Sequence, residues 1–202
     1  MNIKYFLIFI YYMKKYTKRS TKRSTKRKFR KTKRKRGGNP ELFDAVRNKD
    51  HDKVLNLLRN PSVDPNKINE YGYTVLLEAS HLGYVPVLRL LLADERVDPN
   101  MPDQKDRTAL ILAADVGHTS VVALLLADER VDPNIAEQNG HTALMWAAGK
   151  GHDSVVKVLL ADGRVDPDLT NQYGRTAITC ASLNRHDSVV KLLLADDAVW
   201  IN

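Results

Sequence analysis

Cysteine, long apolar runs and, over the first forty residues, acidic side chains are scarce or missing. The one cysteine among 202 residues, Cys180, excludes a disulfide within the chain, and its place in an apolar segment predicts a buried thiol without chemistry. The apolar run 5–13 is nine residues long, about 14 Å as a helix, whereas a membrane span needs about 20 residues. Basic residues follow this run instead of preceding it, which is unlike a signal peptide.

Charge divides the chain into two regions. Residues 1–40 carry 16 of the 32 Lys and Arg and no acid, which leaves 16 basic against 24 acidic residues in the remainder. The segment 14–36 holds 15 basic residues in 23 positions, with TKR recurring every four residues. Like charges at this density repel one another, so we predict a disordered tail at 1–38 and a folded domain at 39–202.

The basic tail fits three uses that the sequence leaves open. One is a nuclear or nucleolar import signal, and another is a nonspecific, salt-dependent grip on RNA or DNA phosphates. The third is shallow attachment to an anionic membrane through the apolar run and the basic segment together. We therefore expect an intracellular protein, located in the nucleus, the nucleolus, the cytoplasm or at a membrane surface. The basic residues concerned are Lys22, Arg23, Lys26, Arg27, Lys28, Arg30, Lys31, Lys33, Arg34, Lys35 and Arg36.

Beyond the tail, the sequence repeats with a period of 34 residues. Threonine recurs as Thr74, Thr108, Thr142 and Thr176, and an Asp-Pro pair begins at Asp64, Asp98, Asp132 and Asp166. A period between about 20 and 50 residues is typical of a solenoid, in which each unit buries its apolar face against its neighbours. We predict an N-terminal cap at 39–68 and repeats at 69–102, 103–136, 137–170 and 171–202, with Val199, Trp200 and Ile201 folding back over the last repeat.

Each unit is predicted to contain two helices and a protruding loop. In the third repeat, Thr142 is expected to cap a first helix that ends at Gly151. Asp153 is expected to cap a second helix, whose crowded apolar residues indicate cover on more than one side. The Asp166-Pro167 turn cannot remain helical, so the chain extends into a finger that reaches the next glycine. The predicted fold class is an all-α solenoid of helix-turn-helix units.

The repeated pattern GxTALxxAAxxGHxxVVxxLL resembles the ankyrin repeat over roughly residues 39–202, with TAL where the family usually has TPLH. The resemblance implies a solenoid with protruding β-turn fingers and a concave binding surface. The family's histidine after TPL is replaced by Leu77, Ile111, Met145 and Thr179, so its hydrogen bonds between repeats should be missing or replaced by apolar packing. The wording ADERVDPN also resembles repeats in the large ankyrin families of protists and giant viruses of amoebae.

Recurring histidines and serines give no support for catalysis. Stacked helices lie about 8–10 Å apart, so equivalent histidines of neighbouring repeats cannot share a zinc ion bound at about 2.1 Å. In the family this histidine is a structural turn residue. The histidines are His118, His152 and His186, and the serines, at first-turn helix positions, are Ser120, Ser154 and Ser188. With no phosphate loop either, we predict a protein that is not an enzyme and holds no cofactor and no metal.

Binding is the function that remains. Positions that vary between copies while their neighbours stay fixed are released from packing, and they fall at the fingertips and the start of the inner helix. By resemblance to the family these positions line the concave surface, although an ordinary solvated loop is the alternative for each. Further variable positions in these segments are Glu70, Leu82, Gln104, Val116, Gln138, Gln172 and Leu183. Trp146, in contrast, is expected in the core. The predicted contact residues are Tyr71, Tyr73, His81, Lys105, Arg107, Asp115, Asn139, His141, Lys150, Tyr173, Arg175 and Asn184.

Tyrosine and arginine are typical anchors of protein interfaces, and Tyr71, Tyr73, Tyr173 and Arg175 are the most prominent of these residues. We therefore predict a monomeric scaffold that binds a protein partner along its groove and has no small-molecule substrate. The basic tail is expected to direct the protein to its location. The alternative is a protein that binds nucleic acid through the tail and recruits a partner through the repeats.

Overall fold

The computed structural model describes the backbone of residues 39–199 and the side chains of residues 39–195. All of them belong to the second of two units of the chain, which begins at Lys35. The predicted tail at 1–38, with all its candidate basic residues, lies outside the described residues, as do Trp200 and Ile201. The predicted fold-back of the last residues therefore stays a prediction, and Val199 is the final residue of a helix.

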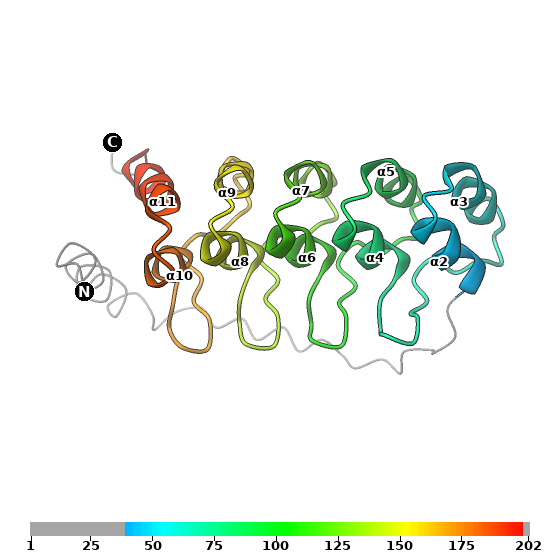
Figure 1. Cartoon of the computed structure of the whole chain (residues 1–202), viewed down its shortest axis with the longest axis horizontal. Coiled ribbons are helices and arrows are strands. Elements are labelled where there is room, and N and C mark those ends of the chain that lie inside the picture. Colours follow the sequence, from blue (N-terminus) through cyan, green and yellow to red (C-terminus); the bar gives the residue numbers. More distant parts are fainter. Residues whose placement is uncertain (1–38, 200–202) are drawn as a thin grey trace. The chain divides into compact units, whose positions relative to one another are not determined.

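Ten α-helices form two parallel rows within the described part of the chain (Figure 1). The inner row contains the first helix of each pair, and fingers project from it. Its members are α2 (Pro40–Arg47), α4 (Val75–His81), α6 (Ala109–Val116), α8 (Ala143–Lys150) and α10 (Ala177–Leu183). The outer row contains α3 (His51–Leu58), α5 (Val85–Ala93), α7 (Thr119–Leu126), α9 (Asp153–Leu160) and α11 (Asp187–Val199). The predicted all-α solenoid of helix-turn-helix units is confirmed.

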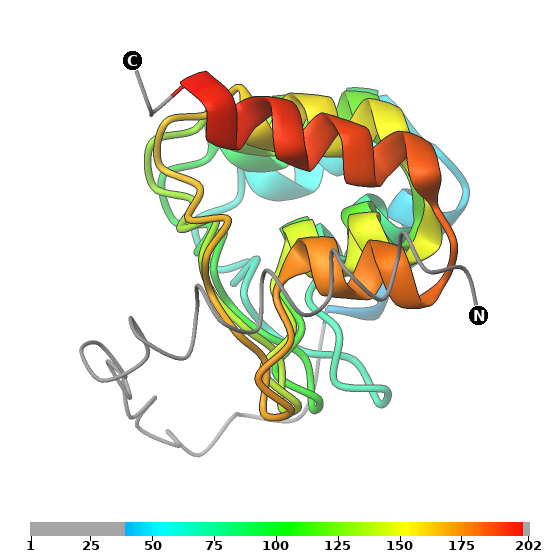
Figure 2. The same cartoon turned by 90° about the vertical axis from the view of Figure 1, so that its left-hand side faces the viewer.

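Figure 2 looks along the stack and shows that the later fingers superpose closely, as units of one repeating geometry should. Each inner helix packs against the inner helix of the next pair, and each outer helix against the next outer helix. The apolar core lies between the rows and between successive pairs, where Leu76, Leu112 and Leu159 are no more than 2% exposed.

Threonine begins the inner helices by capping, as predicted for Thr142. The hydroxyls of Thr74, Thr108 and Thr142 accept hydrogen bonds from the amide three residues later, at 3.2, 3.3 and 3.4 Å. Thr176 makes no such bond, and its hydroxyl lies 3.2 Å from that of Thr179 instead. The cap is therefore lost in the one repeat where a hydroxyl replaces the apolar residue at this position.

The prediction that Asp153 caps the second helix is wrong. The capping position of α9 is His152, and Asp153 is already the first helical residue. The Asp153 carboxylate accepts a hydrogen bond from the Ser188 hydroxyl of the next repeat at 2.9 Å. The histidine ring is engaged elsewhere, so α9 has no side-chain cap.

Histidine joins each repeat to the one before it. The Nε2 atoms of His118, His152 and His186 donate to the backbone oxygens of His81, Asp115 and Gly149, at 3.1, 3.0 and 3.1 Å. Tyr84 holds the equivalent place in the first repeat, and its hydroxyl donates to the backbone oxygen of Lys49 at 2.8 Å. The structural role expected for these histidines is confirmed.

The family's other histidine position is filled by apolar packing, as one of the two predicted outcomes. Leu77, Ile111 and Met145 are at most 2% exposed, and only Thr179 is half-buried.

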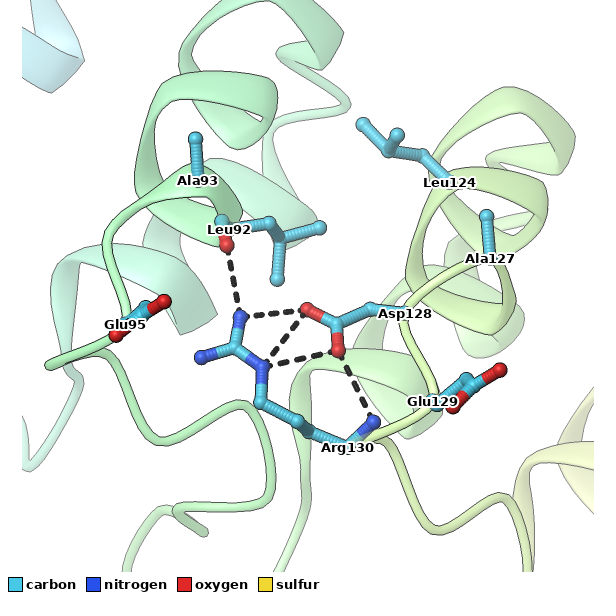
Figure 3. Close-up of a pocket in the computed structure, with 8 residues that line it drawn as sticks. All are labelled: Leu92, Ala93, Glu95, Leu124, Ala127, Asp128, Glu129 and Arg130. Atoms are coloured by element: carbon cyan, nitrogen blue, oxygen red, sulfur yellow. Dashed lines mark hydrogen bonds and ion pairs between the residues drawn. The ribbon is translucent and has the colours of Figure 1, made fainter.

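The arginine of the recurring RVDPN motif binds the preceding repeat, in a contact that we call the arginine clamp. Arg130 donates through Nη2 to the backbone oxygen of Leu92, at the end of α5, and through Nη1 to that of Val97, at 2.7 and 3.2 Å. Its guanidinium also pairs with Asp128 at 2.6 Å (Figure 3). Arg96 and Arg164 bind the preceding repeat in the same way. The clamp thus satisfies carbonyl groups that the preceding helix end would leave without partners.

The asparagine that follows the Asp-Pro pair, as Asn66, Asn100 and Asn134, supplies a second link between repeats. Asn100 donates through Nδ2 to the backbone oxygen of Arg130 and accepts from the amide of Asp132, at 2.6 and 2.8 Å. Asn66 and Asn134 make the same pair of bonds to the repeats that follow them. Three of the four boundaries between described helix pairs therefore carry both an arginine and an asparagine contact, and the last boundary, where the sequence has Ala198 and Asp168 at these positions, carries neither.

Candidate functional site

A polar side chain at the base of each finger, buried in three fingers and half-buried in the first, sets the shape of the tip. Asp103 accepts from the amides of Lys105 and Arg107 at 2.8 and 2.9 Å, although it is only 2% exposed. Asn69 and Asn171 accept from the amides two and four residues later, and Glu137 accepts from that of His141. The turn needs a positive φ at its next-to-last residue, which is glycine in three fingers and Asp106, at 62°, in the other.

Backbone hydrogen bonds connect neighbouring fingers. The amide of Gln138 donates to the backbone oxygen of Lys105 at 3.1 Å, and that of Gln172 donates to the backbone oxygen of Asn139 at 3.0 Å. The Gln138 side chain adds a bond to the backbone oxygen of Gln104 at 2.8 Å. These bonds therefore hold the fingertips in fixed positions relative to one another in the absence of a partner.

The structure brings the predicted contact residues to one side of the repeats, which we call the finger face. It consists of the fingertips at 70–73, 104–107, 138–141 and 172–175 and the last turns of the inner helices. The helical residues lie at the ends of these helices, so the prediction that they lie at the start is wrong. These residues are His81, Asp115 and Lys150, with Val116 and Leu183 beside them, and Leu82 and Asn184 are the C-capping residues that directly follow α4 and α10.

Three predicted contact residues also hold neighbouring fingers together. Arg107 pairs with Asp103 at 2.7 Å and donates to the Tyr73 hydroxyl of the preceding finger at 2.9 Å. His141 bonds through Nδ1 to Glu137 at 2.8 Å and accepts at Nε2 from the Asn171 amide group at 2.9 Å. Sequence reasoning missed these contacts, because the repeat period shows equivalence but not which neighbour a side chain reaches. Their contact with a partner stays a prediction.

Exposed apolar side chains concentrate on the finger face. Tyr71 is 67% exposed and Tyr173 63%, while Leu82, Val116 and Leu183 are between 41% and 53% exposed. Arg175 stacks on the Tyr173 ring, with its guanidinium carbon 5.3 Å from the ring centroid. Within residues 39–195, these five are the large hydrophobic side chains that stay exposed, and the outer helices contribute none of them.

Trp146 is half-buried on the finger face, so the expectation that it lies in the core is only partly correct. Its rings lie beside His141, at a centroid distance of 5.5 Å, and beneath the Lys150 ammonium at 5.8 Å. Lys150 also reaches Asp115 at 3.6 Å. The equivalent positions in other repeats hold the smaller side chains of Leu112 and Cys180, and an indole is too large for the space that they occupy. This difference in size was the feature of the sequence that could have predicted the partial exposure of Trp146.

A hollow of about 410 Å³ opens at the N-terminal end of the finger face. Its walls come from the first two fingers, the end of α2 and the face of α4. The lining residues are Arg47, Asn69, Tyr71, Tyr73, Glu78, His81, Leu82, Asp103, Gln104, Lys105 and Arg107.

The larger hollow, of about 710 Å³, lies between α5 and α7 and contains one arginine clamp (Figure 3). The Arg130 guanidinium and the Asp128 carboxylate in this hollow are bound to each other and to the backbone. The hydrogen bonds from Arg130 keep the pKa of Asp128 below its usual value, against the opposing effect of burial. We assign this hollow a structural role, because the Arg130–Asp128 pair already satisfies itself and the backbone there.

Two further features concern the thiol and possible metal ligands in the described part of the chain. Cys180 is 8% exposed, and burial raises the pKa of its thiol, which disfavours the reactive thiolate. Over the described residues, no group of three or more His, Cys, Asp or Glu side chains is placed to hold a metal ion. None of the helices between residues 39 and 199 has the length and apolar character to cross a membrane.

Comparison with known families agrees with the geometry. Residues 42–137 and 126–201 match a family model described as ankyrin repeats, in three copies. No curated protein matches the chain. The resemblance inferred from the repeated pattern is confirmed, whereas the likeness of the RVDPN wording to particular groups of organisms stays a prediction.

Proposed function

Because this chain belongs to the ankyrin-repeat family, we propose that it acts as a monomeric scaffold that binds a protein partner along its finger face. Ankyrin repeats are in general protein–protein interaction modules, and proteins built from them are typically non-enzymatic. The observation that carries the proposal is the grouping of Tyr71, Leu82, Val116, Tyr173 and Leu183, exposed between 41% and 67%, on this one face.

The physical properties of the finger face suit recognition of a macromolecule. Aromatic residues such as Tyr71 and Tyr173 bury much area for few rotatable bonds, which makes them common anchors at interfaces. The hydrogen-bonded fingers lose little conformational freedom on binding, so the entropic cost of association is reduced. Since the face runs over four repeats, an extended partner surface can contact several tips at once.

A variant that removes the exposed anchors tests the proposal. Tyr71→Ala, Tyr173→Ala and Leu183→Ala, combined in the full chain, take away side chains that are more than half exposed and so leave the core intact. We expect crosslinked capture of the partner from cells to fall at least tenfold, since anchor residues commonly contribute about 2 kcal/mol or more each.

The matched control replaces three exposed outer-row residues, Lys53→Ala, Arg89→Ala and Lys157→Ala. Circular dichroism should show equal helix content and equal melting for both variants. Equal capture by wild type and the finger-face variant, or loss of capture in the outer-row control alone, would contradict the proposal.

The basic segment supports a second proposal, that residues 1–38 direct the protein to phosphate-bearing partners. The 15 basic residues at 14–36 would release counterions from RNA, DNA or an anionic membrane surface, which makes binding strongly dependent on salt. An import signal for the nucleus or nucleolus would use the same residues. The segment lies outside the described residues, so its charge alone carries this proposal.

Deletion of residues 1–38 separates the two proposals. We expect partner capture to survive the deletion, while binding to RNA or to anionic liposomes and any nuclear accumulation are lost. Loss of all partner capture together with steep salt sensitivity would instead mean that the tail performs the binding and that the repeats are secondary.

A further inference from the structure

The hollow at the N-terminal end of the finger face has no carboxylate left to bind a cation. Glu78 accepts from Arg47 Nε and from Asn69 Nδ2. Asp103 accepts two backbone amides of its own finger and pairs with Arg107 at 2.7 Å. Both acidic side chains of the lining are thus engaged within the protein.

Hydrogen-bond donors remain in the same hollow. Within residues 39–195, the Lys105 ammonium makes no ion pair with a carboxylate, and its side chain is exposed. The Tyr73 hydroxyl accepts from Arg107, so its own hydrogen is left to donate to another group. The lining contains Arg47, Lys105 and Arg107 against Glu78 and Asp103, which leaves one excess positive charge among the lining residues. Arg47 also pairs with Asp44, outside the lining, at 3.9 Å, whereas Lys105 has no such pair among residues 39–195.

An apolar wall borders these donors. Tyr71 and Leu82 line the hollow from the first finger and the end of α4, and they stay 67% and 48% exposed. The volume of about 410 Å³ lies within the roughly 300–1,000 Å³ range of small-molecule pockets, so the hollow has room for a large side chain and a carboxylate. The exposed acids Glu70 and Asp106 stand on the same two fingertips, but they do not line the hollow.

We propose that this hollow binds a short segment of the protein partner in which a carboxylate stands next to a large apolar side chain. The carboxylate lies against Lys105 and the Tyr73 hydroxyl, and the apolar side chain packs on Tyr71 and Leu82. An acidic residue beside leucine, isoleucine or phenylalanine supplies both groups. The inference rests on the proposed function, and it adds the chemistry of the segment that docks here.

Selection from a random twelve-residue peptide library on the immobilised full chain, at about 0.3 M salt to suppress the tail, tests the proposal. The counter-selection uses the full-chain variant Tyr71→Ala/Leu82→Ala, which carries the same tail. We expect the peptides that prefer wild type to share an Asp or Glu next to a large apolar residue. Replacing that acid by its amide should weaken binding about tenfold, as for the loss of one charge-assisted hydrogen bond.

Two charge-matched variants separate a local effect from the net charge. Lys105→Glu alters the hollow, and Lys191→Glu makes the same charge change at an exposed position of α11 in the outer row. We expect the selected peptide to bind Lys105→Glu at least tenfold more weakly than it binds Lys191→Glu. Circular dichroism and melting curves confirm that both variants are folded.

The inference is overturned by selected peptides without an acid, by equal binding of acid and amide peptides, or by equal binding to the two charge variants. No peptide preferring wild type over Tyr71→Ala/Leu82→Ala would overturn it too. None of these outcomes removes partner capture through Tyr173 and Leu183, so failure of the inference is distinguishable from failure of the proposed function.

Discussion

At the scale of the residue, glycine and histidine occur as pairs across each repeat boundary. Gly83, Gly117 and Gly151 adopt positive φ at the ends of inner helices, and a Cβ there would come within 2.9 Å of the histidine ring of the next repeat. Two equivalent positions, Lys49 and Arg185, keep the positive φ without glycine. In the repeat that follows Lys49, the position equivalent to His118 is Tyr84 and not histidine. Glycine therefore occurs at the positions that the histidine ring of the next repeat approaches closely.

Substituting Gly117 tests this pairing. Gly117→Ala places a Cβ 2.9 Å from the His152 ring at φ +88°, so we expect the free energy of unfolding to fall by about 2 to 3 kcal/mol. Gly174→Ala has a similar φ of +70° and no atom within 4 Å of the added Cβ, and should cost only about 1 kcal/mol. Urea denaturation gives both values, and equal losses would show that the histidine contact contributes nothing.

At the scale of the element, an arginine clamp from the next repeat completes the ends of three outer helices, α3, α5 and α7. Arg130 binds the backbone oxygens of Leu92 and Val97, which belong to the repeat before it. The positions equivalent to the clamp at the two ends of the series are Ser62 and Ala198. The first has no preceding described helix pair to bind, whereas Ala198 leaves the end of α9 without an arginine clamp although α9 packs against α11.

Removing one clamp should loosen one repeat boundary. For Arg130→Ala we expect a loss of about 1 to 2 kcal/mol in the free energy of unfolding, reduced by solvent screening because the side chain is partly exposed. Arg89→Ala, on the exposed side of α5, is the matched control and should stay within about 0.5 kcal/mol of wild type. A loss as small as that of the control would mean that the clamp is a surface ion pair of no consequence.

The same clamps predict how stability depends on pH. Hydrogen bonds from Arg96, Arg130 and Arg164 lower the pKa of Asp94, Asp128 and Asp162. Each folded pKa lies below the unfolded value of about 3.9, so the stabilisation is present above that value and is lost as the pH falls through the folded pKa. We expect the urea midpoint to decline below about pH 4, and to decline less in Arg130→Met. An identical decline in both proteins would assign the effect to other carboxylates.

At the scale of the whole molecule, stability should vary along the repeats. Contacts are confined to each pair and its neighbours, so α6 and α8 are supported on both sides, whereas α11 has a described neighbour on one side only. We expect amide hydrogen exchange in α6 and α8 to be at least tenfold slower than in α11. Uniform exchange over all pairs would instead indicate a single cooperative unit.

Much of this arrangement could be predicted from the sequence, because the same pattern of residues recurs in each repeat and indicates the same geometry. The period, the threonine cap and the glycine end of the inner helix were predicted from positions in register, whereas the concave face that carries Tyr71 and Tyr173 was predicted from the resemblance to the family. Such positions need no knowledge of the partner atoms, since equivalence alone indicates shared structure.

What the sequence did not predict depends on contacts between repeats. The displaced cap at Asp153, the bond from Arg107 to Tyr73 and the exposure of Trp146 each depend on which side chain of a neighbour lies within reach. The hollow beside Tyr71 is likewise formed by two fingers and two helices at once. A period along one chain cannot show these contacts, because it aligns copies without placing them side by side.

Site-specific photocrosslinking tests the central claim most directly. A benzophenone amino acid would replace Tyr71 or Tyr173 on the finger face, and Arg89 or Lys157 on the outer row, in the full chain expressed in cells. The account predicts one shared protein partner crosslinked from positions 71 and 173 and absent from positions 89 and 157. Crosslinks from the outer row with none from the fingertips would contradict it.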